Sequence, residues 1–153
     1  MLHNFFIMIQ YTSYKQPDSF SPAEEEQVLG FLFTHLEQYG DARQDIQRCL
    51  DYALYRDGKA GGMIFTARDE DKLVGAVVIN HTGMTGYIPE HILVYIATHK
   101  DCRGQGIGQQ LMQMAIAETT GNIALHVEPD NPARKLYEKL GFTNKYLEMR
   151  LNK

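Results

Sequence analysis

Residues 103–108, which read RGQGIG, constrain this chain more than any other part of its sequence. They lie between a run of β-forming residues, 91–98, and a run with helical spacing, 107–119. Glycine adopts backbone conformations that other residues avoid, and it lets a ligand approach the main chain closely. The first N–H groups of the following helix have no partner within that helix and attract anions. The sequence therefore predicts a strand, a tight phosphate-binding turn and a helix in succession.

Length and composition narrow the class of protein. A chain of 153 residues with 44% hydrophobic residues predicts a single domain over 1–153 with a sizeable core. The net charge of −4 argues against nucleic-acid binding, which needs clustered Lys and Arg. Cys49 and Cys102 form no CxxC pair and suggest a reducing, cytoplasmic setting. The apolar run 5–9 is too short to span a bilayer, and the histidine spacing predicts no metal site.

Apolar periodicity and turn residues divide the chain into ten elements in the order β-α-α-β-β-β-α-β-α-β. This order indicates an α/β fold, or more strictly an α+β mixed sheet covered by helices. The run 91–98 is almost continuously apolar, which predicts burial on both faces. Ser21, Asp41 and Asn131 are expected to cap helices. Strands are expected over 5–14, 63–68, 72–80, 91–98, 123–127 and 142–151, and helices from Ser21 to Gly40, from Asp41 to Ala53, over 107–119 and from Asn131 to Gly141.

The glycine loop differs from two common phosphate-binding motifs. A P-loop ends in Gly-Lys-Ser/Thr, whereas Gly108 is followed by Gln109. A dinucleotide fingerprint is GxGxxG near the first strand, with an acidic residue about 20 positions later. Here the spacing is GxGxG and the motif occurs late in the chain. The remaining alternatives are a different phosphate loop and a plain strand-to-helix turn.

Two motifs together resemble one family. Arg103-x-x-Gly106-x-Gly108, between a strand and a helix, resembles the pyrophosphate loop of the GNAT acetyltransferases. Asn131, Ala133, Tyr137 and the run 140–142 resemble the second cofactor-side motif of the same family. The resemblance is strongest over 90–142, and the order of elements extends it to the whole chain.

The resemblance implies a GNAT-like acyl-CoA N-acyltransferase fold that uses acetyl-CoA. Its central mixed sheet would be splayed between the strands 91–98 and 123–127, with helices on both faces. The N–H of Val94 would polarise the thioester carbonyl, and the strand beyond it would align the pantetheine arm. The cofactor-binding residues implied in this way are Val94, Ile96, Ala97, Thr98, Arg103, Gly104, Gln105, Gly106, Ile107, Gly108, Gln109, Asn131 and Tyr137.

Tyr137 is the candidate general acid, because it occupies the matching motif position. A phenol with a pKa of about 10 can protonate a departing thiolate whose conjugate acid has a pKa near 8.5. The alternative is an aromatic side chain that only packs on the sheet.

The base is left open between three groups. Deprotonating an alkylamine of pKa near 10.4 at pH 7 costs about 4.6 kcal/mol, so a proton acceptor is needed. Glu90 matches the glutamate that serves as base in histone-type members of the family, and His91 and water are the alternatives. Strand alternation places Glu90, Ile92, Val94 and Ile96 on one face, and His91, Leu93 and Tyr95 on the other.

The leading hypothesis is an N-acetyltransferase that moves acetyl from acetyl-CoA to a primary amine. Neither cysteine occupies a position expected for an acyl-enzyme, which favours direct attack in a ternary complex. The acceptor is a small-molecule amine or a peptide or protein amine, and the acceptor side is either open or completed by a second copy in a homodimer. The alternative function is a non-catalytic module that binds acyl-CoA for regulation.

Overall fold

The computed structural model describes residues 8–153 and contains one five-stranded mixed sheet. Its strand order is β1-β2-β3-β4-β5, and all neighbours are antiparallel except β4 and β5, which are parallel. The expected mixed sheet is therefore confirmed, and residues 5–7 of the expected first strand lie outside the described residues. The strands are β1 (Ile9–Tyr14), β2 (Gly62–Asp69), β3 (Lys72–His81), β4 (His91–Thr98) and β5 (Ile123–Leu125).

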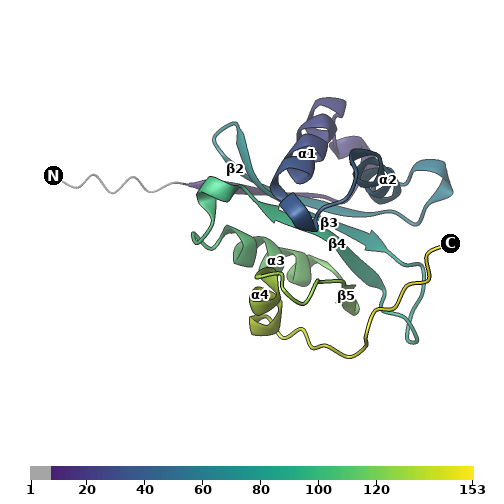
Figure 1. The fold of residues 1–153 in the computed structure, drawn as a ribbon. Helices are drawn as coiled ribbons and strands as arrows, with labels where there is room; N and C mark the ends of the chain where they lie inside the picture. The colour runs from purple at the N-terminus through teal and green to yellow at the C-terminus, as the bar shows by residue number, and fades with distance from the viewer. Residues whose placement is uncertain (1–7) are drawn as a thin grey trace.

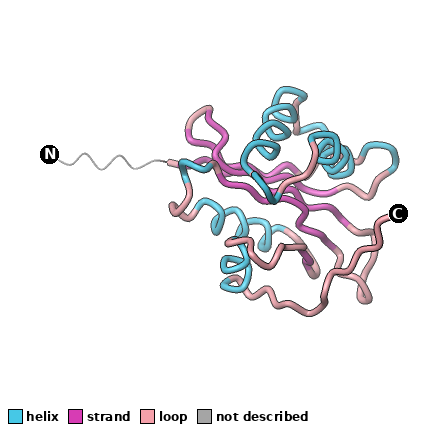
Figure 2. Tube along the Cα trace, viewed as in Figure 1, coloured by secondary structure: helices cyan, strands magenta, loops and turns pink. Residues whose placement is uncertain are grey.

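Helices cover both faces of the sheet, as expected (Figure 1). α1 and α2 lie on one face, whereas α3 and α4 lie on the other (Figure 2). The helices are α1 (Pro22–His35), α2 (Arg43–Ala53), α3 (Ile107–Glu118) and α4 (Ala133–Lys139).

The expected caps are correct for two helices and wrong for one. Ser21 Oγ accepts the Glu24 N–H at 3.1 Å before α1, and Asn131 Oδ1 accepts the Ala133 N–H at 2.9 Å before α4. Asp41 does not cap α2, since its carboxylate accepts the hydroxyl of Tyr95 on β4 at 2.5 Å. A hydroxyl on a buried residue needs a partner, so this long-range bond takes the carboxylate away from the helix end.

Replacing the cap of α1 is expected to lower stability slightly. Ser21→Ala removes the acceptor of the Glu24 N–H, which typically costs about 1 kcal/mol. For a domain of this size the melting temperature should fall by about 2–4 °C in a thermal melt. Ser19→Ala, which removes a hydroxyl bonded to the Gln16 carbonyl outside any α-helix, is the control. Equal melting temperatures for the two variants would contradict the capping role.

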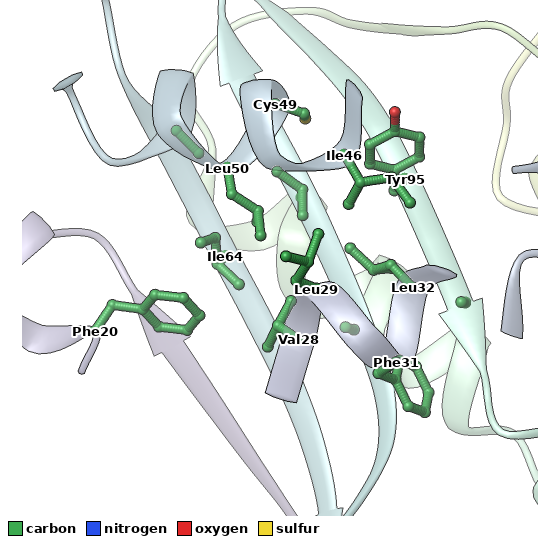
Figure 3. Packing of buried hydrophobic residues seen from close by; sticks show 14 of the residues in the cluster. Phe20, Val28, Leu29, Phe31, Leu32, Ile46, Cys49, Leu50, Ile64 and Tyr95 are labelled. Atoms are coloured by element: carbon green, nitrogen blue, oxygen red, sulfur yellow. The ribbon is translucent and has the colours of Figure 1, made fainter. Parts of the chain in front are cut away.

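Two apolar cores lie on opposite faces of the sheet. The first, here the α1/α2-side core, packs both helices against β2, β3 and β4 and includes Leu32, Ile46 and Leu50 (Figure 3). The second, the α3-side core, contains Phe65, Ile107 and Leu111, all buried almost completely. Apolar burial on both faces holds β4 between the helix layers.

A β-bulge in β4 overturns the expected alternation. Val78 on β3 opposes Tyr95 and Ile79 opposes Leu93, which leaves Val94 as an extra residue. As a result Val94 and Tyr95 both pack on the α1/α2-side core, whereas Leu93 and Ile96 both pack on the α3-side core. The expected face containing both Val94 and Ile96 was wrong, because the extra residue reverses the alternation after Val94.

The sheet splays where β5 ends. β5 pairs with β4 only from His91 to Leu93, and Val94–Thr98 continue without a β5 partner. The expected splay between 91–98 and 123–127 is confirmed, although β5 stops at Leu125. The expected burial of both faces of β4 is confirmed in part: Tyr95 and Ala97 are buried in one core and Leu93 in the other, whereas alternate residues from Ile92 to Thr98 remain partly exposed.

The expected closing strand over 142–151 is absent from the structure. Residues 142–153 form neither helix nor strand, and Leu147, Met149 and Leu151 are each more than 80% exposed. Their alternation with polar residues is typical of a strand, but a strand forms only against a partner. Within residues 8–153, no strand pairs with this segment.

Candidate active site

The glycine loop leaves open space above bare main chain. Gly104 and Gly106 have φ values of 80° and 79°, and no atom lies within 4 Å of a Cβ built on either. Gly106 is the N-terminal boundary of α3, and no side chain caps the helix. The first N–H groups of α3 therefore remain available to an anion. A diphosphate is the kind of anion that such N–H groups attract.

The first turn of α3 lies close to β4 and α4. Ile107 is buried in the α3-side core and anchors the helix. A Cβ on Gly108 would lie 3.4 Å from Thr98 Oγ1 and 3.6 Å from Leu136 of α4. Gln109 accepts a hydrogen bond from Lys139 Nζ at 3.3 Å. The fold thus brings the glycine loop, the end of β4 and α4 close together, although they are separate in the sequence.

Arg103 is bonded to α1 and the residues after it. Its Nη2 donates to the His35 carbonyl at 3.3 Å and to Glu37 Oε1 at 3.2 Å. The guanidinium remains half exposed. These two contacts hold the side chain at the start of the glycine loop.

Val94 lies at the place where the bulge and the splay coincide. It has no partner residue on β3 or on β5. Ile96, Ala97 and Thr98 follow it along the splayed half of β4, where a ligand can meet the main chain.

Tyr137 of α4 is 7% exposed and belongs to the α3-side core, with its ring 6.0 Å from that of Phe142. Burial raises the pKa of its phenol to about 12. The phenol therefore stays protonated at neutral pH and retains a proton to donate.

Glu90 is held by the segments on either side of it. Its Oε2 accepts the Asn122 N–H at 2.8 Å, and its Oε1 accepts the Thr85 hydroxyl at 3.0 Å. These bonds, the Asn122 bond first, lower the pKa of the carboxyl. Both features make the carboxylate a weaker proton acceptor.

His91 is 7% exposed, and both of its ring nitrogens have partners. Nε2 lies 2.6 Å from the Thr120 carbonyl, which can only accept, so Nε2 carries a proton. In the neutral ring, Nδ1 then accepts from His81 Nδ1 at 2.9 Å. The ring ties β4 to β3 and to the segment before β5, and no lone pair is left for an amine.

Similarity to known proteins identifies the family of this chain. A model of the acetyltransferase (GNAT) domain matches residues 60–144, which include β4, the glycine loop and α4. This chain belongs to the GNAT acetyltransferases. Proteins of this family use acetyl-CoA as the acetyl donor.

One curated GNAT relative is N-alpha-acetyltransferase 30 of Schizosaccharomyces pombe, which is 35% identical over 83 residues. The match covers 51% of this chain and 55% of that protein, so the chain aligns with about half the length of its relative.

Solved structures show the same GNAT fold. An aminoglycoside N-acetyltransferase in complex with CoA has a TM-score of 0.69 at 15% identity, covering 95% of each chain. A ribosomal-protein-alanine N-acetyltransferase from Brucella melitensis biovar Abortus 2308 has a TM-score of 0.64 at 17% identity, covering 95% of this chain and 99% of the other. At these identities the likeness concerns the fold alone.

This GNAT domain has a hollow of about 300 Å³ on the α2 side of β4. Val94 lines it, so the hollow reaches the bulge from the face opposite α3. A wider, shallower hollow of about 710 Å³ over α1 and β3 contains none of the expected site residues. Sequence reasoning missed the smaller hollow, because its walls come from segments far apart in the chain. Its lining residues are Tyr52, Asn80, His81, Thr82, Met84, Ile92 and Val94.

Cys49 lies beneath this hollow, where its Sγ accepts from Asn80 Nδ2 at 3.5 Å. Burial raises the pKa of the thiol to about 12. The thiolate needed for an acyl-enzyme is therefore scarce at neutral pH.

Within residues 8–153 of this GNAT domain, no three His, Cys, Asp or Glu side chains gather as metal ligands would. The helices of the same residues are too short or too polar to cross a membrane.

Proposed function

We propose that this chain transfers the acetyl group of acetyl-CoA to a primary amine by direct attack in a ternary complex. The observation that carries the proposal is the position of Val94. This residue is unpaired where the sheet splays, with the glycine loop on the α3 side and a hollow on the α2 side. In this proposal acetyl-CoA approaches the Val94 N–H from the side of the glycine loop, and the amine approaches it from the hollow.

The donor is held by main-chain groups. N–H groups of residues 104–109 bind the diphosphate, with Arg103 adding charge nearby and Asn131 fixing the start of α4. Ile96, Ala97 and Thr98 align the pantetheine arm along the open half of β4. The Val94 N–H then stabilises the negative charge that develops on the thioester oxygen.

The chemistry balances without a covalent enzyme intermediate. The amine nitrogen forms a bond to the acetyl carbon, the carbon–sulfur bond breaks, and Tyr137 gives its proton to the leaving thiolate. Solvent later returns a proton to the phenolate. The raised pKa of Cys49 supports this direct route over one through an acyl-enzyme.

Water is the proposed acceptor of the amine proton, since Glu90 and His91 are both engaged by other groups. An α-amine with a pKa near 7.7–8.0 loses its proton at pH 7 for about 1 kcal/mol, against about 4.6 kcal/mol for a lysine. A site without a strong base therefore favours an α-amine. The name of the fission-yeast relative, an N-alpha-acetyltransferase, supports the same class of acceptor.

Glu90→Gln is expected to affect stability more than turnover. The lowered pKa of Glu90 in the folded chain means that its bonds stabilise the fold above the unfolded pKa of about 4.3. This stabilisation is lost as pH falls through the lower folded value. Thermal melts should show a lower melting temperature for Glu90→Gln at pH 7 and a smaller difference at pH 3.

In the same variant kcat should fall by less than about tenfold, below the usual range for loss of a general base. The exposed Glu128→Gln is the control. A fall in kcat of about 100-fold at an unchanged melting temperature would restore Glu90 as the base.

A homodimer is part of the proposal. Each copy carries both segment 146–151, which is exposed and forms neither helix nor strand, and the outer edge of β5, which no strand of residues 8–153 covers. In a two-fold dimer, segment 146–151 of each copy can therefore pair with the outer edge of β5 of the other copy. Light scattering across a concentration series should give a molecular mass twice that of the chain. The mass of a monomer at every concentration would exclude the proposed dimer.

The function is tested with purified protein, acetyl-CoA and three acceptor classes. These are small amines, peptides with a free α-amine, and N-blocked peptides with one lysine. Release of free thiol together with transfer of one acetyl mass supports the proposal. Thermal stabilisation by acetyl-CoA without thiol release for any class would favour the alternative, an acyl-CoA-binding module. Absence of measurable affinity for coenzyme A would exclude both.

A further inference from the structure

The hollow beside Val94 has the dimensions of a side-chain pocket. Its volume of about 300 Å³ is at the lower end of ligand-binding pockets. β3, β4, α2 and the segment 82–84 all contribute to its wall. A group bound there lies next to the residue at which acetyl transfer is proposed.

The wall of this pocket is mainly apolar and carries no charged residue at neutral pH. Tyr52, Met84, Ile92 and Val94 supply aromatic, thioether and aliphatic surface. No Asp, Glu, Lys or Arg lines it. The lining residue His81 is bonded to the His91 ring, and burial lowers its pKa, which favours the neutral form of its ring. A charged group in this pocket would lose hydration without gaining an ionic partner.

One polar atom in this wall is unsatisfied. Asn80 Nδ2 donates to Cys49 Sγ, whereas Asn80 Oδ1 is buried and has no hydrogen-bond partner among residues 8–153. An unpaired buried acceptor costs about 1–3 kcal/mol. An N–H from a bound acceptor would remove that penalty after a small movement of the amide.

We propose, on the basis of the function proposed above, that this pocket binds the uncharged aliphatic first side chain of a peptide whose α-amine is acetylated. Asn80 Oδ1 accepts an N–H of the same peptide. The apolar wall selects the side chain, and its position beside Val94 presents the α-amine to the thioester. The class of acceptor is thus a peptide N-terminus that begins with a residue such as Leu or Met.

The test uses peptides that differ only in their first residue, which is Leu, Met, Asp or Lys, together with an N-blocked peptide carrying one lysine. Thiol release gives kcat/KM for each. We expect the Leu and Met peptides to exceed the Asp and Lys peptides by about tenfold or more, as a mismatch of about 1.4 kcal/mol would produce. The N-blocked peptide should react least.

Two variants connect this preference to the pocket. Met84→Glu places a carboxylate in the wall and should raise the ratio of Lys-peptide to Leu-peptide kcat/KM by about tenfold. Met8→Glu, the same change at an exposed position before β1 and outside the pocket, should leave the ratio unchanged. Asn80→Leu, of similar size, should raise the KM for the Leu peptide with little change in kcat or in acetyl-CoA affinity.

The outcomes separate this proposal from the function on which it depends. Equal kcat/KM for all first residues would overturn it, as would a preference that Met84→Glu leaves unchanged. Reaction with small amines or lysine peptides alone would also overturn it and leave the transferase function intact. Absence of thiol release with every acceptor would instead count against the transferase function itself.

Discussion

Tyr137→Phe is expected to lower kcat by about 100-fold or more, while acetyl-CoA affinity changes by less than about threefold. The phenol is 7% exposed within the α3-side core, so a phenylalanine ring fills the same space. Only the proton donor is lost, and general acid catalysis typically contributes about 10²–10⁴-fold. Steady-state thiol release gives kcat, and calorimetric titration gives the Kd of acetyl-CoA.

The matched control for this variant is Tyr11→Phe, which removes a hydroxyl from a tyrosine packed on the same core but located on edge strand β1. It should leave kcat unchanged. Because the pKa of Tyr137 is raised to about 12, the wild-type kcat should not decline through ionisation of this phenol below about pH 10. Equal kcat for wild type and Tyr137→Phe would remove Tyr137 from the mechanism.

Gly106→Ala is expected to weaken acetyl-CoA binding by about tenfold or more. At a φ of 79° an alanine is strained by about 1–2 kcal/mol, which should lower the melting temperature by about 2–8 °C. The methyl group also enters the open space where the diphosphate is proposed to approach α3. Tenfold in Kd corresponds to about 1.4 kcal/mol, and calorimetric titration measures it.

Gly58→Ala separates strain from binding. Gly58 has a φ of 71° and open space around its Cβ position, as Gly106 does, but it lies after α2 and away from the glycine loop. Its variant should show a similar fall in melting temperature and an unchanged Kd for acetyl-CoA. If both variants bind acetyl-CoA as tightly as wild type, the diphosphate does not lie against Gly106.

Features that depend on neighbours along the chain were predictable from the sequence. The glycine loop leading into α3, the cap at Ser21 and the Asn131–Pro132 start of α4 each involve a few consecutive residues. The mixed sheet, the splay and the family were predictable because the glycine loop and the motif from Asn131 to Phe142 occur together at the spacing typical of the GNAT acetyltransferases. The prediction for Asp41 failed because its partner, Tyr95, lies 54 positions away.

The sequence by itself determined the order of all elements but the last, because periodicity, capping and glycine conformations act over a few bonds. The residues expected to face the donor stay predictions. Only the tertiary structure decided which face each residue of β4 presents, since the bulge at Val94 depends on register with β3. It also decided the partners of Glu90 and His91, the pocket under Asn80 and the absence of the last strand. Each of these depends on contacts between segments distant in the chain, which local patterns do not encode.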